Sequence, residues 1–569
     1  MRKEWPLAAS ALCLYAVYYL ALLYHPGLLR MDDFGYLRSV GETVAYGWPR
    51  TDDWLEPYSA LTSTAGGLAF AATGDFPLST WGLHALWSLA AFLIIRRCLR
   101  LRLEPGPATL LTFALVGLPM YAHKTSEFSG NVPTLVCGLL AFLAFGRRRW
   151  LAFYAATFLA FASRQNSAAL LALPAWEALL LASARNTHDT MDGRARELRR
   201  ILIGGACFAA AAVAFHFTMN RTVAQELGIY AGFPPTRLIA IARTAAFGLC
   251  ASLAFLSAFS LLTGDGAAAN LRANFARPLV PATATAAFAA VAWATPLPLF
   301  SFLTPLLGSL DRGFAMQYAA MAAIPCLYWM LDWKQLRMDG PLLLAIGFTA
   351  VSCLKGFWYD FYLVDVAVGA LLFRLTRPHA FAPGAFAKAM ACGIIAANLG
   401  WAVGYKVLSD KQRLSVHIYE RLERAGRIAP PDMTDATFGY GGWKLAGPFR
   451  DLATHEDLAL FQGFVLRDKV VIDTEAPWRR AFKRGSGGAL VLEEGVASIG
   501  WMNLKYRVME IQGNPPVSLI NRPPLAFDRE RYQRDPYPLS AEEWGLWMEG
   551  QRVRQGGNGS WFRIKAPGT

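Results

Sequence analysis

Residues 6–24 read "PLAASALCLYAVYYLALLY", a run without a charged side chain. A run of this length can cross the hydrocarbon core of a bilayer as a helix. It follows "MRKEW" and could be taken for the apolar part of a signal peptide, but it lacks a small-residue cleavage site. We therefore predict that residues 6–24 form a retained membrane helix.

The following part of the chain repeats this pattern. The protein has 569 residues, 54% of them hydrophobic, and its apolar runs are bounded by charge, Pro or Gly. With the first run they make about thirteen transmembrane helices. The further predicted spans are 78–95, 107–121, 132–146, 149–163, 165–183, 201–218, 238–262, 279–295, 314–331, 341–354, 359–375 and 386–403.

Lys and Arg predict the orientation of these spans. They gather in alternate loops, such as "RRCLRLR" (96–102), "GRRRW" (146–150) and "RNTHDTMDGRARELRR" (185–200), which share one side with the N-terminus. Short loops rich in Lys and Arg stay in the cytoplasm. We therefore expect a cytoplasmic N-terminus and an exported C-terminal part. The net charge of +14 follows mostly from this topology and does not indicate a nucleic-acid partner.

The composition changes near Gly404, where charged residues, Gly and Pro rise and no further span appears. We expect two domains: residues 1–403 in the membrane and residues 404–569 as a soluble exported α+β domain. That domain opens with an amphipathic helix around Leu414, and it continues with strands at 469–473, 488–495 and 504–511. The predicted fold class is an α-helical polytopic membrane protein with a C-terminal α+β domain.

The first exported loop, residues 25–77, holds two pairs of acids, Asp32/Asp33 and Asp52/Asp53, among several Trp and Tyr side chains. Carboxylates can act as general bases, and flat aromatic rings suit the apolar faces of sugars. An ordinary interpretation also holds: acids are tolerated outside the first span, and Trp and Tyr are common membrane-interface anchors.

Other exported segments carry an acid and three cations. Glu127 lies in "YAHKTSEFSGNVP" (121–133), Arg164 lies between two apolar runs, and Arg312 and Lys355 lie beside later spans. An Arg at the edge of the hydrocarbon region is costly unless it meets an anion or reaches toward water. Arg164 is therefore a candidate for phosphate binding. Arg312 and Lys355 are cations on the side where cations are scarce, and snorkelling at helix ends is the ordinary interpretation of each.

Together these motifs resemble the GT-C glycosyltransferases of bacteria. Asp32-Asp33-Phe34-Gly35-Tyr36, then Arg38 and Gly47, and then residues 56–62 ("EPYSALT") are similar to the first-loop pattern of the arabinofuranosyltransferase-like and protein-mannosyltransferase-like branches. The resemblance covers residues 1–403. It implies a multi-pass enzyme of the bacterial inner membrane that moves a sugar from a polyprenyl-phosphate donor to a glycan, lipid or protein acceptor on the periplasmic face.

The resemblance also implies roles for individual residues. Asp32 or Asp33 acts as the general base or orients the acceptor hydroxyl, and the pattern does not choose between them. Glu127 is the second-loop acid, and Arg312, Lys355 and Arg164 bind the donor phosphate. A direct displacement inverts the anomeric carbon. No cofactor is implied with certainty, and the need for a divalent metal is left open. The predicted acceptor-binding residues are Tyr36, Arg38, Asp53, Trp54, Glu56 and Tyr58.

Three other classes compete with this interpretation. A transporter or flippase of lipid-linked sugars would share the apolar spans and buried cations, but it favours broken helices in paired positions, which the sequence does not display. A membrane-bound O-acyltransferase would need a histidine in a span, as His84 and His216 are. A non-catalytic scaffold would not need acids in two exported loops.

Overall fold

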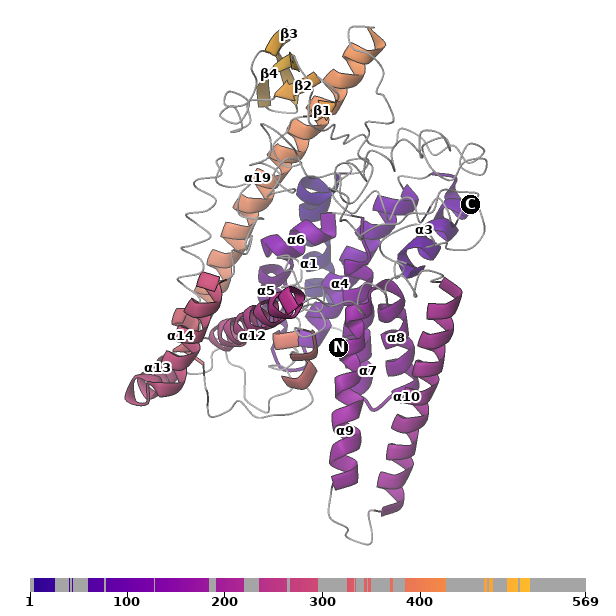
Figure 1. Cartoon of the computed structure of the whole chain (residues 1–569), viewed down its shortest axis with the longest axis vertical. Coiled ribbons are helices and arrows are strands. Elements are labelled where there is room, and N and C mark those ends of the chain that lie inside the picture. Colours follow the sequence, from indigo (N-terminus) through magenta and orange to yellow (C-terminus); the bar gives the residue numbers. More distant parts are fainter. Residues whose placement is uncertain are drawn as a thin grey trace.

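The structure is a computed structural model of the chain, and Figure 1 shows its arrangement. The residues that it describes are 5–25, 40, 43, 60–75, 78–126, 128–183, 191–219, 235–263, 267–294, 325–331, 333, 342–344, 346–348, 369–371, 384–425, 465–467, 470–473, 489–499 and 502–511.

The first part of the chain is a bundle of helices, several of them broken. The α-helices are α1 (Trp5–Tyr18), α3 (Ala60–Thr73), α4 (Leu83–Leu99), α5 (Pro105–Val116), α6 (Pro119–Ser126), α7 (Asn131–Gly146), α8 (Trp150–Ser163), α9 (Ala172–Ser183) and α10 (Met191–Met219). Short tighter or wider turns join some of them: the π-helical turns η2 (Tyr19–Leu23) and η3 (Leu78–Gly82), and the 3₁₀ helix η4 (Gln165–Leu171).

Aromatic side chains pack the centre of this bundle. The ring of Tyr15 in α1 stacks on Phe92 in α4 with 4.7 Å between the ring centroids, and Phe92 also meets Phe113 in α5. Tyr15 and Phe92 are fully buried. Because aromatic side chains bury a large area, these contacts fix α1 against α4 and α5.

Three further helices follow: α12 (Pro235–Thr263), α13 (Ala267–Ala276) and α14 (Leu279–Ala294). Asn274 of α13 donates through its side-chain amide to the carbonyls of Trp329 and Leu331, at 2.8 and 2.9 Å. Figure 1 shows α12–α14 on the opposite side of the molecule from α7–α10.

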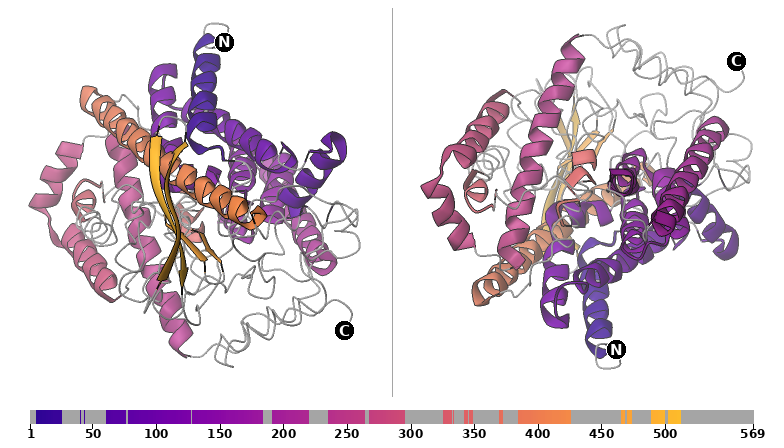
Figure 2. Two further views of the ribbon diagram at one scale, coloured as in Figure 1. Left: turned by 90° about the horizontal axis from the view of Figure 1, so that it is seen from above. Right: turned by 90° about the horizontal axis from the view of Figure 1, so that it is seen from below.

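The longest described element is α19 (Ala385–Arg424), a helix of 40 residues. It crosses the molecule and ends beside a small sheet (Figures 1 and 2). The amide of Asn398 donates to the carbonyl of Ala114 at 3.0 Å, which fixes α19 to the end of α5. The predicted last span and the predicted amphipathic helix around Leu414 are therefore one continuous helix, which runs through Gly404.

The sheet contains β1 (Val465–Arg467), β2 (Val470–Asp473), β3 (Ala489–Ile499) and β4 (Met502–Ile511), in the order β1-β2-β4-β3 with antiparallel neighbours. The three predicted strands are confirmed. The short strand β1 was not predicted, because its residues 465–467 are few and lie close to the next strand.

Among the residues that the structure describes, five helices are long and apolar enough to cross a membrane, or six if the bent pair α6 and α7 counts as one span. The five are residues 5–23, 78–99, 166–183, 193–215 and 387–407, which confirms the corresponding predictions. The described part of the chain is thus a multi-pass helical membrane protein. Several later predicted spans lie largely outside the described residues, so thirteen stays a prediction.

Two details differ from the sequence expectations. The predicted single span 107–121 is divided, because α5 ends at Val116 and α6 begins at Pro119. Proline removes a backbone donor and disrupts the preceding helical turn. In addition, α10 begins at Met191, so most of the basic segment 185–200 is helical and not a simple loop.

Candidate functional site

One of the predicted site residues, Arg164, lies within the described residues. The others lie outside them: Asp32, Asp33, Glu127, Arg312, Lys355, Tyr36, Arg38, Asp53, Trp54, Glu56 and Tyr58. The structure does describe the immediate neighbours of two segments that the sequence predicts to be exported. His25 is the first residue of the first loop, and Ser126 and Phe128 flank Glu127.

Side chains hold the end of α6, directly before Glu127. A helix leaves its last four carbonyls without helical partners. In α6 three of these carbonyls accept hydrogen bonds from side chains. The carbonyl of His123 accepts from the Ser126 hydroxyl at 2.7 Å, and the carbonyl of Thr125 accepts from the Tyr19 hydroxyl at 2.6 Å. The carbonyl of Lys124 accepts a longer bond, 3.4 Å, from the His84 ring. Because Tyr19 belongs to η2 and His84 to α4, two other helices fix the position from which residue 127 continues.

Tyr405 of α19 joins the same helix end. Its hydroxyl bonds to the Ser126 Oγ, and its ring meets the His123 ring edge-on with 5.9 Å between centroids. The Ser126 hydroxyl already donates its only proton to the His123 carbonyl. It follows that Tyr405 donates to Ser126, and the result is a chain of two buried hydroxyls that ends on the backbone of α6.

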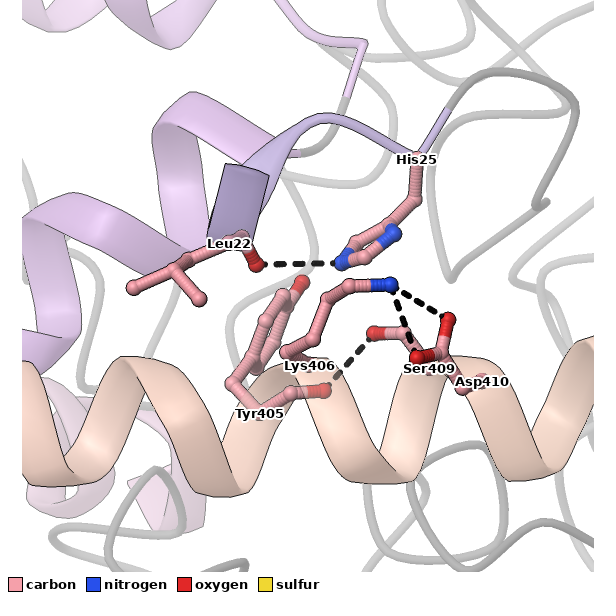
Figure 3. Close-up of polar contacts among 6 residues, drawn as sticks. All are labelled: Leu22, His25, Tyr405, Lys406, Ser409 and Asp410. Carbon is pink, nitrogen blue, oxygen red and sulfur yellow. Dashed lines mark hydrogen bonds and ion pairs between the residues drawn. The ribbon is translucent and has the colours of Figure 1, made fainter. Parts of the chain in front are cut away.

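His25 also contacts Tyr405. Its ring centroid lies 6.1 Å from that of Tyr405, and its Nε2 donates to the Leu22 carbonyl at 3.1 Å (Figure 3). Because a carbonyl only accepts, Nε2 carries the ring proton in this contact. Lys406, the residue after Tyr405, contacts both carboxylate oxygens of Asp410, one turn further along α19, at 2.7 Å. The beginning of the first loop and the residue before Glu127 therefore both lie against the middle of α19.

The chain is broken twice in this region. The chain bends by 115° between α6 and α7 at a break that contains Glu127, and α8 ends at Ser163 before the 3₁₀ turn η4. The two breaks touch, because the Ser163 hydroxyl donates to the Gly130 carbonyl at 2.9 Å. Non-helical backbone at membrane depth occurs where it is buried in protein or lines a cavity.

Gly130 allows this close approach. A Cβ atom added to it would lie 2.8 Å from the backbone oxygen of Ser163 and 3.5 Å from Cγ of Arg164. Its φ of −71° is ordinary, so the requirement for glycine is steric and comes from the neighbouring helix break.

Arg164 lies at the second break in extended conformation, with φ −156° and ψ 134°. It is 9% exposed, and its aliphatic part lies beside Gly130, three residues after Glu127. Lys124, three residues before Glu127, is 2% exposed. A snorkelling side chain keeps its charged end in water. Arg164 and Lys124 are both too deeply buried for this interpretation. Two buried cations therefore lie on either side of Glu127 in the sequence, in the segment 121–133 and directly after α8.

His84 belongs to this region but does not support acyl transfer. It is buried, meets Phe128 edge-on with 5.9 Å between centroids, and donates through Nε2 to the Lys124 carbonyl. These contacts assign it a structural role at the end of α6. The side chain of His216 lies outside the described residues.

The structure brings His25, Ser126 and Tyr405 together in the candidate site, and the sequence interpretation did not single out these three residues. Tyr405 carries no local signal, because it follows a Gly in an apolar helix and its partners are 279 and 380 residues away in the chain. Within the described ranges no group of three or more His, Cys, Asp or Glu side chains is arranged to hold a metal ion.

No family model matches the chain, and no curated protein matches its sequence significantly. Two solved structures of ArnT from Cupriavidus metallidurans are similar in arrangement. The structure bound to undecaprenyl phosphate has a TM-score of 0.39 and 13% identity, and the match covers 88% of this chain and 97% of that one. The apo structure has a TM-score of 0.36 and 13% identity, with 80% and 75% covered.

Proposed function

We propose that the protein is an integral-membrane glycosyltransferase that moves a sugar from a polyprenyl-phosphate donor to a cell-envelope glycan, lipid or protein. The sequence pattern around Asp32 and Asp33 suggests the GT-C class. The described structure supports a site at the junction of both exported segments with α19. In this proposal the site faces the periplasm of a bacterial inner membrane, and residues 404–569 form the exported domain.

The observation that carries the proposal is the burial of Arg164 at the contact of two helix breaks. The leaving group of the reaction is a phosphate monoester, and its growing negative charge needs preorganised cations. Arg binds phosphate with two parallel hydrogen bonds. Arg164, with Lys124 across the second segment, supplies positive charge in a water-poor environment, where it acts most strongly.

The remaining chemistry falls to the acids. A sugar hydroxyl is a weak nucleophile, so a carboxylate within hydrogen-bond reach assists by accepting its proton. We assign this role to Asp32 or Asp33, and the second-loop role to Glu127. Arg312 and Lys355 remain further candidates for the donor phosphate. Tyr36, Arg38, Asp53, Trp54, Glu56 and Tyr58 remain the candidates for acceptor binding.

A transporter of lipid-linked sugars is the second candidate, and the two helix breaks favour it. Discontinuous helices near the membrane centre are typical of transporter substrate sites. Such a protein would bind a polyprenyl-phosphate lipid through the same cations but would not need an acid pair beside the acceptor. Turnover therefore separates the two candidates, whereas lipid binding does not.

The test is sugar transfer by the purified full-length protein from a panel of polyprenyl-phosphate sugars to envelope extracts, with undecaprenyl phosphate as the binding probe. We expect wild-type turnover, and a loss of at least about a hundredfold in Asp32→Asn or Asp33→Asn with unchanged melting temperature. The variant that loses turnover identifies the base. Lipid binding without transfer from any donor, together with flux of the donor across proteoliposomes, would replace the enzyme by the transporter.

A further inference from the structure

We propose that Tyr405 is a positioning residue that holds the two exported segments at a fixed separation. This inference rests on the proposed function, since the segments in question carry Asp32, Asp33 and Glu127. Tyr405 belongs to α19, the helix that contains the predicted boundary between the membrane domain and the exported domain.

The contacts of Tyr405 give the first reason. The residue is fully buried, and its ring contacts the rings of both His25 and His123, with Trp401 stacked 4.9 Å away on its own helix. His25 begins the first loop, and His123 lies in the last turn of α6. A single side chain therefore contacts the start of both segments that hold the proposed acids.

The hydroxyl of Tyr405 gives the second reason. It donates to Ser126, and Ser126 donates to the His123 carbonyl. Ser126 is the residue before Glu127, so this bond sets the direction in which the second segment leaves α6. A catalytic group displaced by about 1 Å can cost about a hundredfold in rate. The hydroxyl is therefore placed to affect turnover without touching substrate.

The surrounding helix adds rigidity to this contact. The Ser409 hydroxyl donates to the Tyr405 carbonyl at 2.8 Å, and Lys406 is paired with Asp410 (Figure 3). Asn398 fixes α19 to the carbonyl of Ala114 two turns before. Asn398 thus fixes to α5 the part of α19 that precedes Tyr405, while the contacts that follow Tyr405 lie within α19.

Tyr405→Phe is the test variant, because it removes one hydroxyl and keeps the ring. Tyr154→Phe is the matched control: Tyr154 is also buried, and its hydroxyl donates to the Ile201 carbonyl at 2.9 Å, between α8 and α10. Each variant loses one buried hydrogen bond. We expect similar melting temperatures for both. Ser126→Ala breaks the same chain from the other end and serves if Tyr405→Phe does not fold.

The first measurement is kinetic and uses the donor that wild type turns over. We expect kcat of Tyr405→Phe to fall about tenfold to a hundredfold while the KM for the donor stays within about twofold. Tyr154→Phe retains wild-type kcat. The double variant with Ser126→Ala loses little more than either single variant, because both changes break one chain.

The second measurement does not need turnover. Spin labels at Leu28→Cys and Asn131→Cys, in full-length protein without its native cysteines, report the distance between the two segments. We expect a broader or shifted distance distribution in Tyr405→Phe and an unchanged one in Tyr154→Phe. The proposal is overturned if Tyr405→Phe has the same distance distribution and the same kcat as Tyr154→Phe. It is also overturned if wild type is active and Tyr405→Phe changes only the distance distribution or only kcat.

These results separate the two proposals. If no donor is turned over but the distance distribution changes only in Tyr405→Phe, the glycosyltransferase assignment fails and the positioning role stands. If wild type transfers sugar and Tyr405→Phe behaves like Tyr154→Phe in both measurements, the enzyme stands and the positioning role fails.

Discussion

Helix α8 ends in two different environments. Before its first residue, Arg148 has a side chain that is 64% exposed and pairs with Glu177 of α9 at 3.1 Å. After its last residue, Arg164 is 9% exposed and lies against a broken helix. The same residue type is thus solvated at one end of a helix and buried at the other.

The backbone differs in the same way. At the first end, α7 and α8 are joined by a tight turn through Arg148, whose φ is 53°, and the indole of Trp150 donates to Glu197 of α10 at 2.7 Å. At the other end, two interrupted helices meet through Gly130 and Ser163. Exposed cations beside regular helices follow the charge rule of membrane loops. Buried cations at broken helices are costly, which is why the second end is the candidate site.

Removing each arginine tests this comparison most strongly. We expect Arg164→Gln to lower sugar transfer by about a hundredfold or more, because a preorganised cation at the leaving phosphate is lost. Arg148→Gln changes transfer by less than about twofold, since an exposed ion pair contributes little. Initial rates from the active donor, beside melting curves, measure both.

If Arg164→Gln and Arg148→Gln were equally active, the end of α8 that holds Arg164 would be no better a candidate site than the end that holds Arg148. A loss of folding in Arg164→Gln would leave Arg164→Lys as the informative variant. Lys keeps the charge but not the paired hydrogen bonds, so we expect it to retain partial binding of undecaprenyl phosphate.

Two glycines at the ends of α7 test the backbone contrast. Gly130→Ala places a methyl group 2.8 Å from the Ser163 carbonyl oxygen, so we expect it to destabilise the protein by about 1–3 kcal/mol. A Cβ at Gly146 meets nothing within 4 Å, and Gly146→Ala should be neutral or stabilise by up to about 1 kcal/mol. Melting in detergent compares the two.

The Gly130 variant also affects chemistry. A shift of the backbone at residue 130 moves the segment that contains Glu127, so transfer should fall further than stability alone explains. If Gly130→Ala and Gly146→Ala melt and turn over alike, the two helix breaks do not form a tight contact.

The sequence predicted the helices where their apolar runs are bounded by strong signals. The runs 6–24 and 165–183 correspond to helices that are long and apolar enough to cross a membrane, and strands β2, β3 and β4 lie where β-rich segments are separated by Gly. It did not predict the break between α5 and α6, because the apolar composition continues through Gly117 and Pro119. A Pro within an apolar run is compatible with either a kink or a break.

The sequence could indicate which charged residues belong to the candidate site, but not which residues they contact. Arg164 stood out because a cation between two apolar runs is costly. Its burial beside Gly130 depends on a bond between Ser163 and a residue 33 positions away. The role of Tyr405 depends on still more distant partners, and hydrophobic periodicity carries no information about them.

The smallest expected effect comes from the ion pair at the first end of α8. Glu177→Gln removes the partner of Arg148, and we expect it to change the free energy of unfolding by less than about 1 kcal/mol, because both charges reach water. The small difference should shrink further at high salt, as screening weakens exposed pairs. Melting at two ionic strengths measures it, and transfer should not change. A cost as large as that of Gly130→Ala would mean that this end is also a tightly packed polar cluster, and burial of charge would then no longer single out the end that holds Arg164.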